Sequence, residues 1–330
     1  MVSKLYCEAS PLNLSSLATI VKPEAKTRAE FIEKCRQEAY SDVVVIYRTY
    51  YSANITGLID EELVDVLPES VKFICHSGAG YDQIDVGACS QRQIQVSNAP
   101  EVVNNATADT ALFLMPGALR GFNQSILSLR GGFWRGISSL PLGHDPDGKT
   151  IGILGCGGIG RNIVKKAAAF GMRVIYYNRT KSSHITEAEY VTFDELVRSS
   201  DVISICTPLN TNTRHVLSHK EFSMIKQGVV VINTARGPII DAEALVAALG
   251  NGKVWSFGLD VYELEPNIHP DLIAHPRSML LPHLGTYTIE ELRTHVYTHT
   301  RMKARCISNV RSALEHGKLR DLVPEQSDGV

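Results

Sequence analysis

The chain has 330 residues, of which 44% are hydrophobic and 21% are charged. This apolar content excludes an intrinsically disordered chain, and the length is enough for two cores of ~150 residues each. The 33 Lys and Arg residues nearly balance the 35 Asp and Glu residues, so the net charge favours neither a nucleic-acid nor an anionic-membrane partner.

The N-terminal sequence and the cysteines bear on location. Residues 1–7 contain no apolar segment typical of a secretory signal, and no apolar run in the chain approaches the ~20 residues of a membrane span. The seven cysteines are odd in number and include no C-x-x-C pair, which favours free thiols in a reducing compartment. We therefore expect a cytoplasmic protein without a membrane partner.

Short apolar runs alternate with helical patterns, which is typical of an α/β fold with parallel sheets. Val43 to Tyr47 and Val71 to Cys75 predict buried strands in the first hundred residues. A second series of six runs predicts a doubly wound nucleotide-binding domain; the runs are Thr150 to Leu154, Arg173 to Tyr177, Asp201 to Cys206, Val229 to Asn233, Val254 to Leu259 and Ser278 to Leu281.

Two helical segments are predicted to connect the domains. The first runs from Val102 to Arg120 and contains Pro116, which predicts a kink or a local weakness. The second runs from Thr288 to His316 and returns the chain to the first domain. We therefore expect a discontinuous substrate-binding domain of residues 1–101 and 286–330, and a dinucleotide-binding domain of residues 102–285.

A glycine-rich motif, Gly155-Cys156-Gly157-Gly158-Ile159-Gly160, follows a predicted strand and precedes a predicted helix. This is the context that a dinucleotide-binding G-x-G-x-x-G loop requires. Gly155 would permit the tight turn, Gly157 the close approach of a pyrophosphate, and Gly160 the close packing of helix on strand.

The end of the second strand of this domain reads Asn178-Arg179-Thr180-Lys181. A domain that prefers NAD places an acidic residue here to accept the ribose hydroxyls, whereas this chain has a neutral amide followed by cations and a hydroxyl. Such a cluster suits a 2′-phosphate, with Arg179 as a fork-shaped donor. We predict a preference for NADP(H); if these are ordinary surface cations, NAD(H) remains the alternative.

Three further motifs follow the carboxyl ends of predicted strands, where ligands gather in an open α/β sheet. They are Asn233 to Gly237, Asp260 to Pro266 and Leu281 to Gly285. Arg236, a glutamate and His283 would arrive there together. Such a set offers a carboxylate clamp, an orienting acid and a proton carrier.

With these motifs and Gly78-Ala79-Gly80-Tyr81-Asp82, the chain resembles the D-isomer specific 2-hydroxyacid dehydrogenase family. The resemblance is most specific between about Val71 and Gly285. Segments such as Gly132 to Gly136 look like a fungal branch that includes glyoxylate/hydroxypyruvate reductases and D-mandelate dehydrogenases. The family fold implies a Rossmann domain and a flavodoxin-like domain, with the active site in the cleft between them.

The resemblance also implies residue roles. Arg236 would hold the substrate carboxylate, His283 would donate the proton, and Glu265 would orient the imidazole, with Glu263 as a less suitable candidate. The substrate contacts would comprise Ser77, Gly78, Ala79, Gly80, Arg236, His283 and Trp134. The cofactor contacts would comprise Thr107, Gly155, Gly157, Gly158, Ile159, Gly160, Asn178, Arg179, Thr180, Cys206, Pro208, Thr213, Thr234, Ala235, Arg236, Asp260, His283 and Gly285.

Some of these residues have a simpler interpretation. Asp260 could be structural, and His76 beside the Gly78 loop is expected to pack within its strand, with a role in the pocket as the alternative. The resemblance implies that Trp134 lies on a loop of the kind that, in the resembling reductases, carries an aromatic residue across a dimer interface into the partner's substrate pocket. The alternative is a tryptophan packed on its own subunit. We expect a homodimer.

The function implied is the reduction of a 2-oxo acid to the D-2-hydroxy acid, with glyoxylate or hydroxypyruvate as the first substrates to consider. A D-mandelate-type enzyme acting on bulkier aryl or branched 2-oxo acids is the alternative within the class. Transcriptional corepressors that sense dinucleotides share the fold and the Arg-Glu-His set. A corepressor-like scaffold is therefore the alternative from another class.

Overall fold

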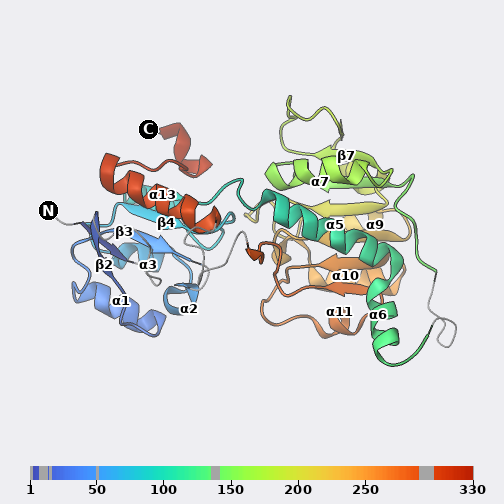
Figure 1. The fold of residues 1–330 in the computed structure, drawn as a ribbon, viewed down its shortest axis with the longest axis horizontal. Coiled ribbons are helices and arrows are strands. Elements are labelled where there is room, and N and C mark those ends of the chain that lie inside the picture. Colours follow the sequence, from blue (N-terminus) through green and yellow to red (C-terminus); the bar gives the residue numbers. More distant parts are fainter. Residues whose placement is uncertain are drawn as a thin grey trace. The chain divides into compact units, whose positions relative to one another are not determined.

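The computed structural model describes residues 3–6, 14, 17–49, 52–134, 142–289 and 301–329. The chain forms two compact units (Figure 1). The first unit comprises Met1–Val103 and Tyr287–Val330, and the second comprises Asn104–Thr286. Most of the first half of the predicted second connecting helix, residues 290–300, lies outside the described residues.

The first unit is built on a parallel five-stranded sheet in the order β2-β1-β3-β4-β5. The strands are β1 (Ser3–Tyr6), β2 (Ala18–Val21), β3 (Val43–Arg48), β4 (Phe73–His76) and β5 (Gln95–Ser97). The helices are α1 (Arg28–Arg36), α2 (Ala53–Thr56), α3 (Glu61–Val66), α4 (Val86–Gln91) and α13 (Arg301–His316), followed by the 3₁₀ turn η3 (Pro324–Gly329). The predicted strands at 43–47 and 71–75 correspond to β3 and β4.

Val45, Ile46 and Tyr47 of β3 alternate between opposite layers of helices, as the two-residue period of a strand requires, and a register irregularity after Val43 puts this residue on the face of Ile46. Val43 and Ile46 join a core with α1, α3 and α4, whereas Val45 and Tyr47 join a core with α13. In Figure 1, α13 lies on one side of this sheet and α1 on the other.

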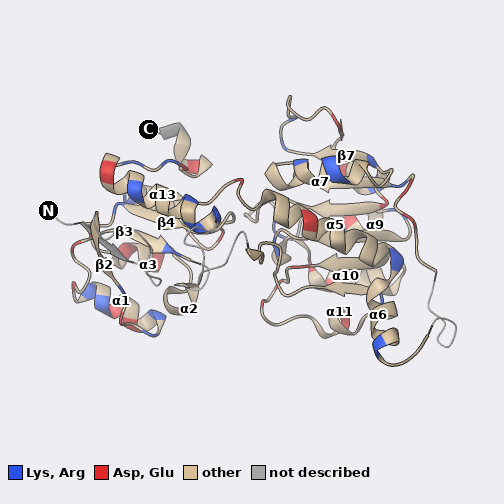
Figure 2. Cartoon of the chain, in the orientation of Figure 1, with Lys and Arg blue, Asp and Glu red and all other residues tan. Residues whose placement is uncertain are grey.

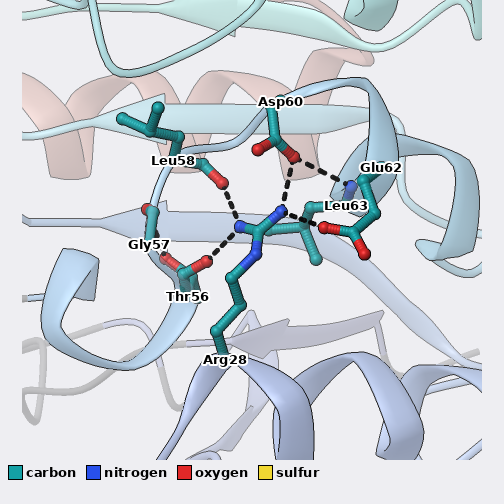
Figure 3. A network of polar contacts seen from close by, with 7 residues as sticks. All are labelled: Arg28, Thr56, Gly57, Leu58, Asp60, Glu62 and Leu63. Carbon is teal, nitrogen blue, oxygen red and sulfur yellow. Dashed lines mark hydrogen bonds and ion pairs between the residues drawn. The ribbon is translucent and has the colours of Figure 1, made fainter.

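The side chain of Arg28 ties α1 to the segment between α2 and α3 (Figure 3). Its Nη1 donates to the carbonyl oxygens of Thr56 and Leu58, both at 2.6 Å. Its Nη2 donates to Asp60 at 2.6 Å and to Glu62 at 2.9 Å. A single guanidinium therefore holds the loop that enters α3.

The second unit contains a parallel seven-stranded sheet in the order β12-β11-β10-β9-β6-β7-β8. Its strands are β6 (Thr150–Leu154), β7 (Arg173–Tyr177), β8 (Glu189–Tyr190), β9 (Val202–Ile205), β10 (Val229–Asn233), β11 (Val254–Leu259) and β12 (Ser278–Leu280). All six predicted strands are present, and β8 is an additional edge strand. The strand order reverses between β6 and β9, and ligands of doubly wound sheets bind at such a switch point.

Helices cover both faces of this sheet. They are α5 (Asn104–Arg120), α6 (Phe122–Arg130), α7 (Gly158–Ala168), α8 (Phe193–Ser199), α9 (His219–Met224), α10 (Ala242–Gly250) and α11 (Pro270–Ala274), with the 3₁₀ turn η2 (Gly237–Ile239). Val230 and Ile232 of β10 face α5 and α7, and Val229 and Val231 face α8, α9 and α10. Figure 1 shows α5 and α7 over the same face.

The long helix predicted around Pro116 is present as a single element. Helix α5 runs without interruption from Asn104 to Arg120 with Pro116 inside it. Leu114 and Met115, just before the proline, are 0% and 1% exposed, and Ala118 just after it is also buried. Burial of this face compensates for the hydrogen bond that a proline cannot donate.

Charged residues of both signs are interspersed over the helices of each unit (Figure 2). Helix α1 illustrates this, with Glu30 in its first turn and Lys34 and Arg36 in its last. Within the described ranges, no helix has both the length and the apolar character needed to cross a membrane.

Candidate functional site

The glycine-rich loop connects β6 to α7 at the switch point of the second unit, and its glycines occupy three different environments. Gly155 has a φ of +92°, and a Cβ there would lie 2.6 Å from the backbone nitrogen of Thr207. A Cβ at Gly160 would lie 2.7 Å from the carbonyl oxygen of Gly155. A Cβ at Gly157 would meet no atom within 4 Å. Gly155 therefore permits the turn and Gly160 the packing, while Gly157 leaves open space at the start of α7.

These features fit a dinucleotide. The N-terminus of α7 presents unpaired N–H groups and the positive end of the helix dipole beside the open space at Gly157. Asn104, the first residue of α5, covers the loop, because a Cβ at Gly158 would lie 2.1 Å from its Nδ2. The Cys156 side chain is buried, and burial raises the pKa of its thiol to about 12. No sequence pattern singles out Asn104, since only the fold places it here.

Asn178, directly after β7, is bound to the glycine-rich loop. Its Oδ1 accepts a hydrogen bond from the Cys156 N–H at 2.7 Å, and its Nδ2 donates to the Cys156 carbonyl at 3.3 Å. Arg179 and Thr180 follow and are exposed. Arg179 forms no ion pair with any residue in the described part of the chain. Asn178 therefore fixes the loop and leaves the Arg179 cation available to an anionic group.

Other predicted cofactor residues lie at the strand ends of the same unit. Thr213 donates to the Pro208 carbonyl at 2.7 Å and accepts from the Asn210 N–H at 2.8 Å, so its hydroxyl holds this turn. Thr234, next to β10, is 7% exposed, and its Oγ1 finds no hydrogen-bond partner among the described residues. A buried hydroxyl without a partner is costly unless a ligand satisfies it.

The remaining predicted cofactor residues are buried or half-buried. Thr107 of α5 faces Gly285, since a Cβ at Gly285 would lie 3.5 Å from the Thr107 methyl group. Ile159 packs against the apolar layer beneath α5 and α7. Burial raises the pKa of the Cys206 thiol to about 12. Ala235 is half-buried beside β10.

His283 and Glu265 form a close pair. The imidazole Nδ1 lies 2.9 Å from Glu265 Oε2, and Glu265 Oε1 accepts the Tyr262 N–H at 2.9 Å. Burial acts to raise the pKa of Glu265. The hydrogen bonds from His283 and Tyr262 and the charge of Arg236 outweigh it, so the pKa is lowered. Glu265 is therefore a carboxylate at neutral pH, able to stabilise a protonated imidazole.

Asp260, at the end of β11, supports the backbone that carries His283. Its carbonyl oxygen accepts the His283 N–H at 2.8 Å, and its carboxylate accepts the N–H groups of Leu284 and Gly285 at 2.6 and 2.7 Å. His283 has a φ of +57°, an uncommon conformation for a residue with a side chain. Asp260 is 1% exposed, and burial raises its pKa despite these bonds. Asp260 thus holds the strained turn in place.

Arg236 follows β10, which neighbours β11 in the sheet. The Asn233 side chain shapes this turn by accepting the Ala235 N–H at 3.0 Å and donating to the Arg236 carbonyl at 2.9 Å. A Cβ at Gly237 would lie 1.9 Å from the carbonyl carbon of Tyr262. The turn of Arg236 and the segment of Glu265 are therefore in backbone contact, which brings Arg236, Glu265 and His283 to one edge of the sheet.

Glu263 has a different partner. Its Oε1 lies 2.5 Å from His215 Nε2, and its Oε2 accepts the N–H of Ala242 at the start of α10. The backbone N–H of His215 donates to the Pro238 carbonyl at 2.8 Å. Of the two glutamates considered for His283, only Glu265 contacts it in the structure.

In the first unit, the loop Gly78-Ala79-Gly80 follows β4 and the buried Ser77. The Gly78 carbonyl accepts the Ala99 N–H at 2.8 Å, and the Ala79 carbonyl accepts Asn98 Nδ2 at 2.6 Å. The Gly80 carbonyl lies 3.0 Å from His76 Nε2. None of the loop's three N–H groups has an acceptor among the described residues. The loop is thus suited to bind an anion.

Trp134 is 70% exposed in the second unit. Its reach across a dimer interface and its packing on its own subunit both stay predictions. Its neighbours at 135–141 lie outside the described residues.

The chain is similar to known proteins over most of its length. Residues 112–285 match the family described as "D-isomer specific 2-hydroxyacid dehydrogenase, NAD binding domain". The chain is 50% identical to 4-methyl-2-oxopentanoate reductase A of Aspergillus oryzae over 96% of its own length and 94% of the relative's.

Two solved structures are also similar. One is a glyoxylate reductase from Paecilomyes thermophila, with 48% identity, a TM-score of 0.93, and coverage of 98% of this chain and 99% of that one. The other is an NADPH-dependent glyoxylate/hydroxypyruvate reductase from Sinorhizobium meliloti in complex with NADP and malonate. It has 28% identity, a TM-score of 0.83, and 98% coverage of both chains. The chain belongs to the D-isomer specific 2-hydroxyacid dehydrogenase family.

Proposed function

We propose that this protein is an NADPH-preferring reductase that converts a 2-oxo acid to the D-2-hydroxy acid. The observation that carries the proposal is the pairing of His283 with Glu265 at 2.9 Å, close enough to Arg236 for its charge to act on the same carboxylate. A proton donor, its anionic partner and a carboxylate-binding cation are the groups that reduction of a 2-oxo acid requires.

Each residue has a defined task in this reaction. The Arg236 guanidinium binds the substrate carboxylate and aligns the carbonyl group. When bound, the reduced nicotinamide supplies a hydride to the carbonyl carbon. His283 gives a proton to the carbonyl oxygen from Nε2, while Nδ1 remains bonded to Glu265. In the first unit, we assign the N–H groups of Gly78, Ala79 and Gly80 to the substrate carboxylate as well.

The preference for NADPH rests on the residues after β7. Asn178 brings no negative charge, and both of its polar groups are used on the Cys156 backbone. A 2′-phosphate would meet the exposed Arg179 guanidinium and the Thr180 hydroxyl without repulsion. The NADP complex of the Sinorhizobium meliloti relative supports the same choice.

Glyoxylate and hydroxypyruvate are the first substrates we propose, because the two solved relatives are named for them. A branched substrate, 4-methyl-2-oxopentanoate, is the second. It is favoured by the 50% identity to the Aspergillus oryzae reductase over nearly the whole chain.

We further propose a cytoplasmic homodimer. Helix α6 buries none of its residues, and several of its apolar side chains are exposed: Phe122, Ile126, Leu127 and Leu129. Exposed apolar patches of this kind mark interaction sites, and a second copy of the chain would cover this one together with Trp134. The free thiols of the described cysteines fit a reducing compartment.

Steady-state oxidation of NADPH, and separately of NADH, tests the function. The panel contains glyoxylate, hydroxypyruvate, 4-methyl-2-oxopentanoate and benzoylformate, with chiral analysis of any chiral product. We expect turnover with NADPH and formation of the D-enantiomer. Tight cofactor binding without turnover on any acid would contradict the proposal and favour a corepressor-like sensor.

A further inference from the structure

A buried arginine lies behind the Gly78-Ala79-Gly80 loop. Arg48, the last residue of β3, is 1% exposed and pairs in register with His76, the last residue of β4. Its Nη1 lies 3.3 Å from His76 Nδ1, and its Nη2 donates to Gln83 Oε1 at 2.7 Å. Its carbonyl oxygen accepts the Ser77 N–H at 2.7 Å, which fixes the entry into the loop.

These contacts determine the protonation of His76. A guanidinium can only donate hydrogen bonds, so His76 Nδ1 must be the acceptor and carries no proton. The other nitrogen, Nε2, then carries the proton of the neutral imidazole and donates it to the Gly80 carbonyl at 3.0 Å. From the sequence, His76 is expected to pack within its strand, with a role in the pocket as the alternative. It is buried, but it also bridges Arg48 to the loop.

The bridge leaves little freedom to the loop. A Cβ at Gly78 would lie 2.5 Å from His76 Nε2, so the imidazole lies directly against the backbone. With the bonds from Ala99 and Asn98, all three loop carbonyls are held by protein donors. A loop whose carbonyls are engaged cannot rotate its peptide groups to present oxygen to an anion, and its N–H groups stay available.

We propose that Arg48 and His76 are positioning residues for substrate binding. Arg48 holds the neutral imidazole of His76, which holds the Gly80 carbonyl and so keeps the loop in its anion-binding form. The buried guanidinium also places a positive charge behind the loop, where low-dielectric surroundings strengthen its attraction for a carboxylate. This role rests on the proposed function, because it assigns the loop to the carboxylate of the 2-oxo acid.

Substitutions at His76 separate positioning from packing. In His76→Gln, the amide oxygen can accept from Arg48 and the amide nitrogen can donate to Gly80, so the bridge is retained. His76→Leu fills similar space but does neither. We expect the KM for the 2-oxo acid to rise about tenfold in His76→Leu, because this corresponds to the loss of one hydrogen bond to a charged ligand. In His76→Gln we expect this KM to stay within about threefold of the wild-type value. The dissociation constant for NADPH should not change in either variant.

Arg48→Met should raise the same KM, and Arg28→Met is its matched control. Arg28 is an arginine of the same unit whose guanidinium also holds a loop, but one between α2 and α3 (Figure 3). We expect Arg28→Met to lower the melting temperature and leave the KM unchanged. A KM that is unchanged in folded His76→Leu and Arg48→Met would overturn the proposal.

A measurement without turnover tests the same inference. The ¹⁵N chemical shifts of labelled imidazoles distinguish the two neutral forms and the cation. The His76 signals are identified by their loss in His76→Gln. In the wild-type protein at pH 7, we expect His76 to carry a proton on Nε2 and none on Nδ1. In Arg48→Met we expect a mixture of protonation forms. A proton on Nδ1 in wild type would overturn the proposal even if the enzyme reduces 2-oxo acids. Absence of turnover with the expected shifts would instead refute the proposed function.

Discussion

Glu265 and Asp260 both interact with His283 or its backbone, and burial and hydrogen bonding shift the pKa values of their carboxyl groups in opposite directions. Burial acts to raise the pKa of both Glu265 and Asp260. In Glu265 the bonds from His283 and Tyr262 prevail and the pKa is lowered, whereas in Asp260 burial prevails and the pKa is raised. The environments therefore assign different tasks: Glu265 is the anionic partner of the imidazole, and Asp260 holds the backbone of the turn.

Glu265→Gln tests the first task. The amide keeps a hydrogen-bond acceptor but removes the charge that favours the protonated imidazole. We expect kcat/KM for reduction to fall about tenfold at pH 7 and its alkaline limb to move to lower pH. A pH–rate profile of wild type and variant measures both effects. An unshifted profile would show that the Glu265 charge does not act on the proton donor.

The same substitution has a predicted effect on acid stability. Because the folded-state pKa of Glu265 is below its ordinary value of 4.5, the stabilisation by its charge is complete above about pH 4.5. It is lost as the pH falls through the lower, folded-state pKa. The melting temperature of wild type should therefore exceed that of Glu265→Gln at pH 7, and the difference should shrink towards pH 3. A difference that grows on acidification would contradict this assignment.

Arg179→Ala tests the basis of cofactor preference without disturbing Asn178, whose side chain supports the glycine-rich loop. We expect the KM for NADPH to rise about tenfold and that for NADH to change little, since only the 2′-phosphate is lost as a partner. Arg198→Ala, a change of an exposed arginine near the end of α8, is the control and should alter neither value. An equal rise for both cofactors would refute a role in phosphate recognition.

At the scale of elements, the central strands were predictable because parallel strands covered on both faces read as continuous apolar runs. Val229–Asn233 is fully buried and was predicted with its correct bounds. Edge strand β8 has only two residues, neither of them buried, and gave no such signal. Pro116 lies inside α5 without ending the helix, because tertiary packing of α5 outweighs the local penalty.

The candidate site was predictable only in part, for a related reason. Topology alone carries Arg236, Glu265 and His283 to neighbouring strand ends. The bonds that hold their surroundings join segments distant in sequence, such as Asn178 to Cys156 and Arg48 to His76. No local pattern distinguishes these residues from others of their type.

The glycine-rich loop permits a comparison between two positions of one element. Gly157→Ala places its Cβ in open space, so we expect little change in melting temperature but a rise of about tenfold or more in the dissociation constant for NADPH. Gly160→Ala directs its Cβ at the Gly155 carbonyl and should cost about 1–3 kcal/mol of folding stability. Calorimetry and cofactor titration of both variants measure this. Full NADPH affinity in Gly157→Ala would contradict binding of the pyrophosphate there.

At the scale of the whole molecule, the apolar surface of α6 bears on assembly. Leu127→Glu places a charge on a side chain that is 61% exposed in the single chain. We expect wild type to sediment at twice the mass of one chain and the variant to sediment as a monomer, because a dimer interface would bury the new charge. Leu58→Glu, at a leucine of the first unit that is 55% exposed, is the matched control and should remain dimeric. A monomeric wild type would refute the dimer.

Removal of the proton donor is the most direct test of the proposed reaction. In His283→Ala, kcat for the best 2-oxo acid should fall by about 10²- to 10⁴-fold, the usual contribution of a general acid. The dissociation constant for NADPH and the melting temperature should stay close to those of wild type, since Asp260 holds this turn through backbone groups that the substitution leaves in place. Retention of wild-type turnover in the folded variant would contradict the role of His283 as the proton donor.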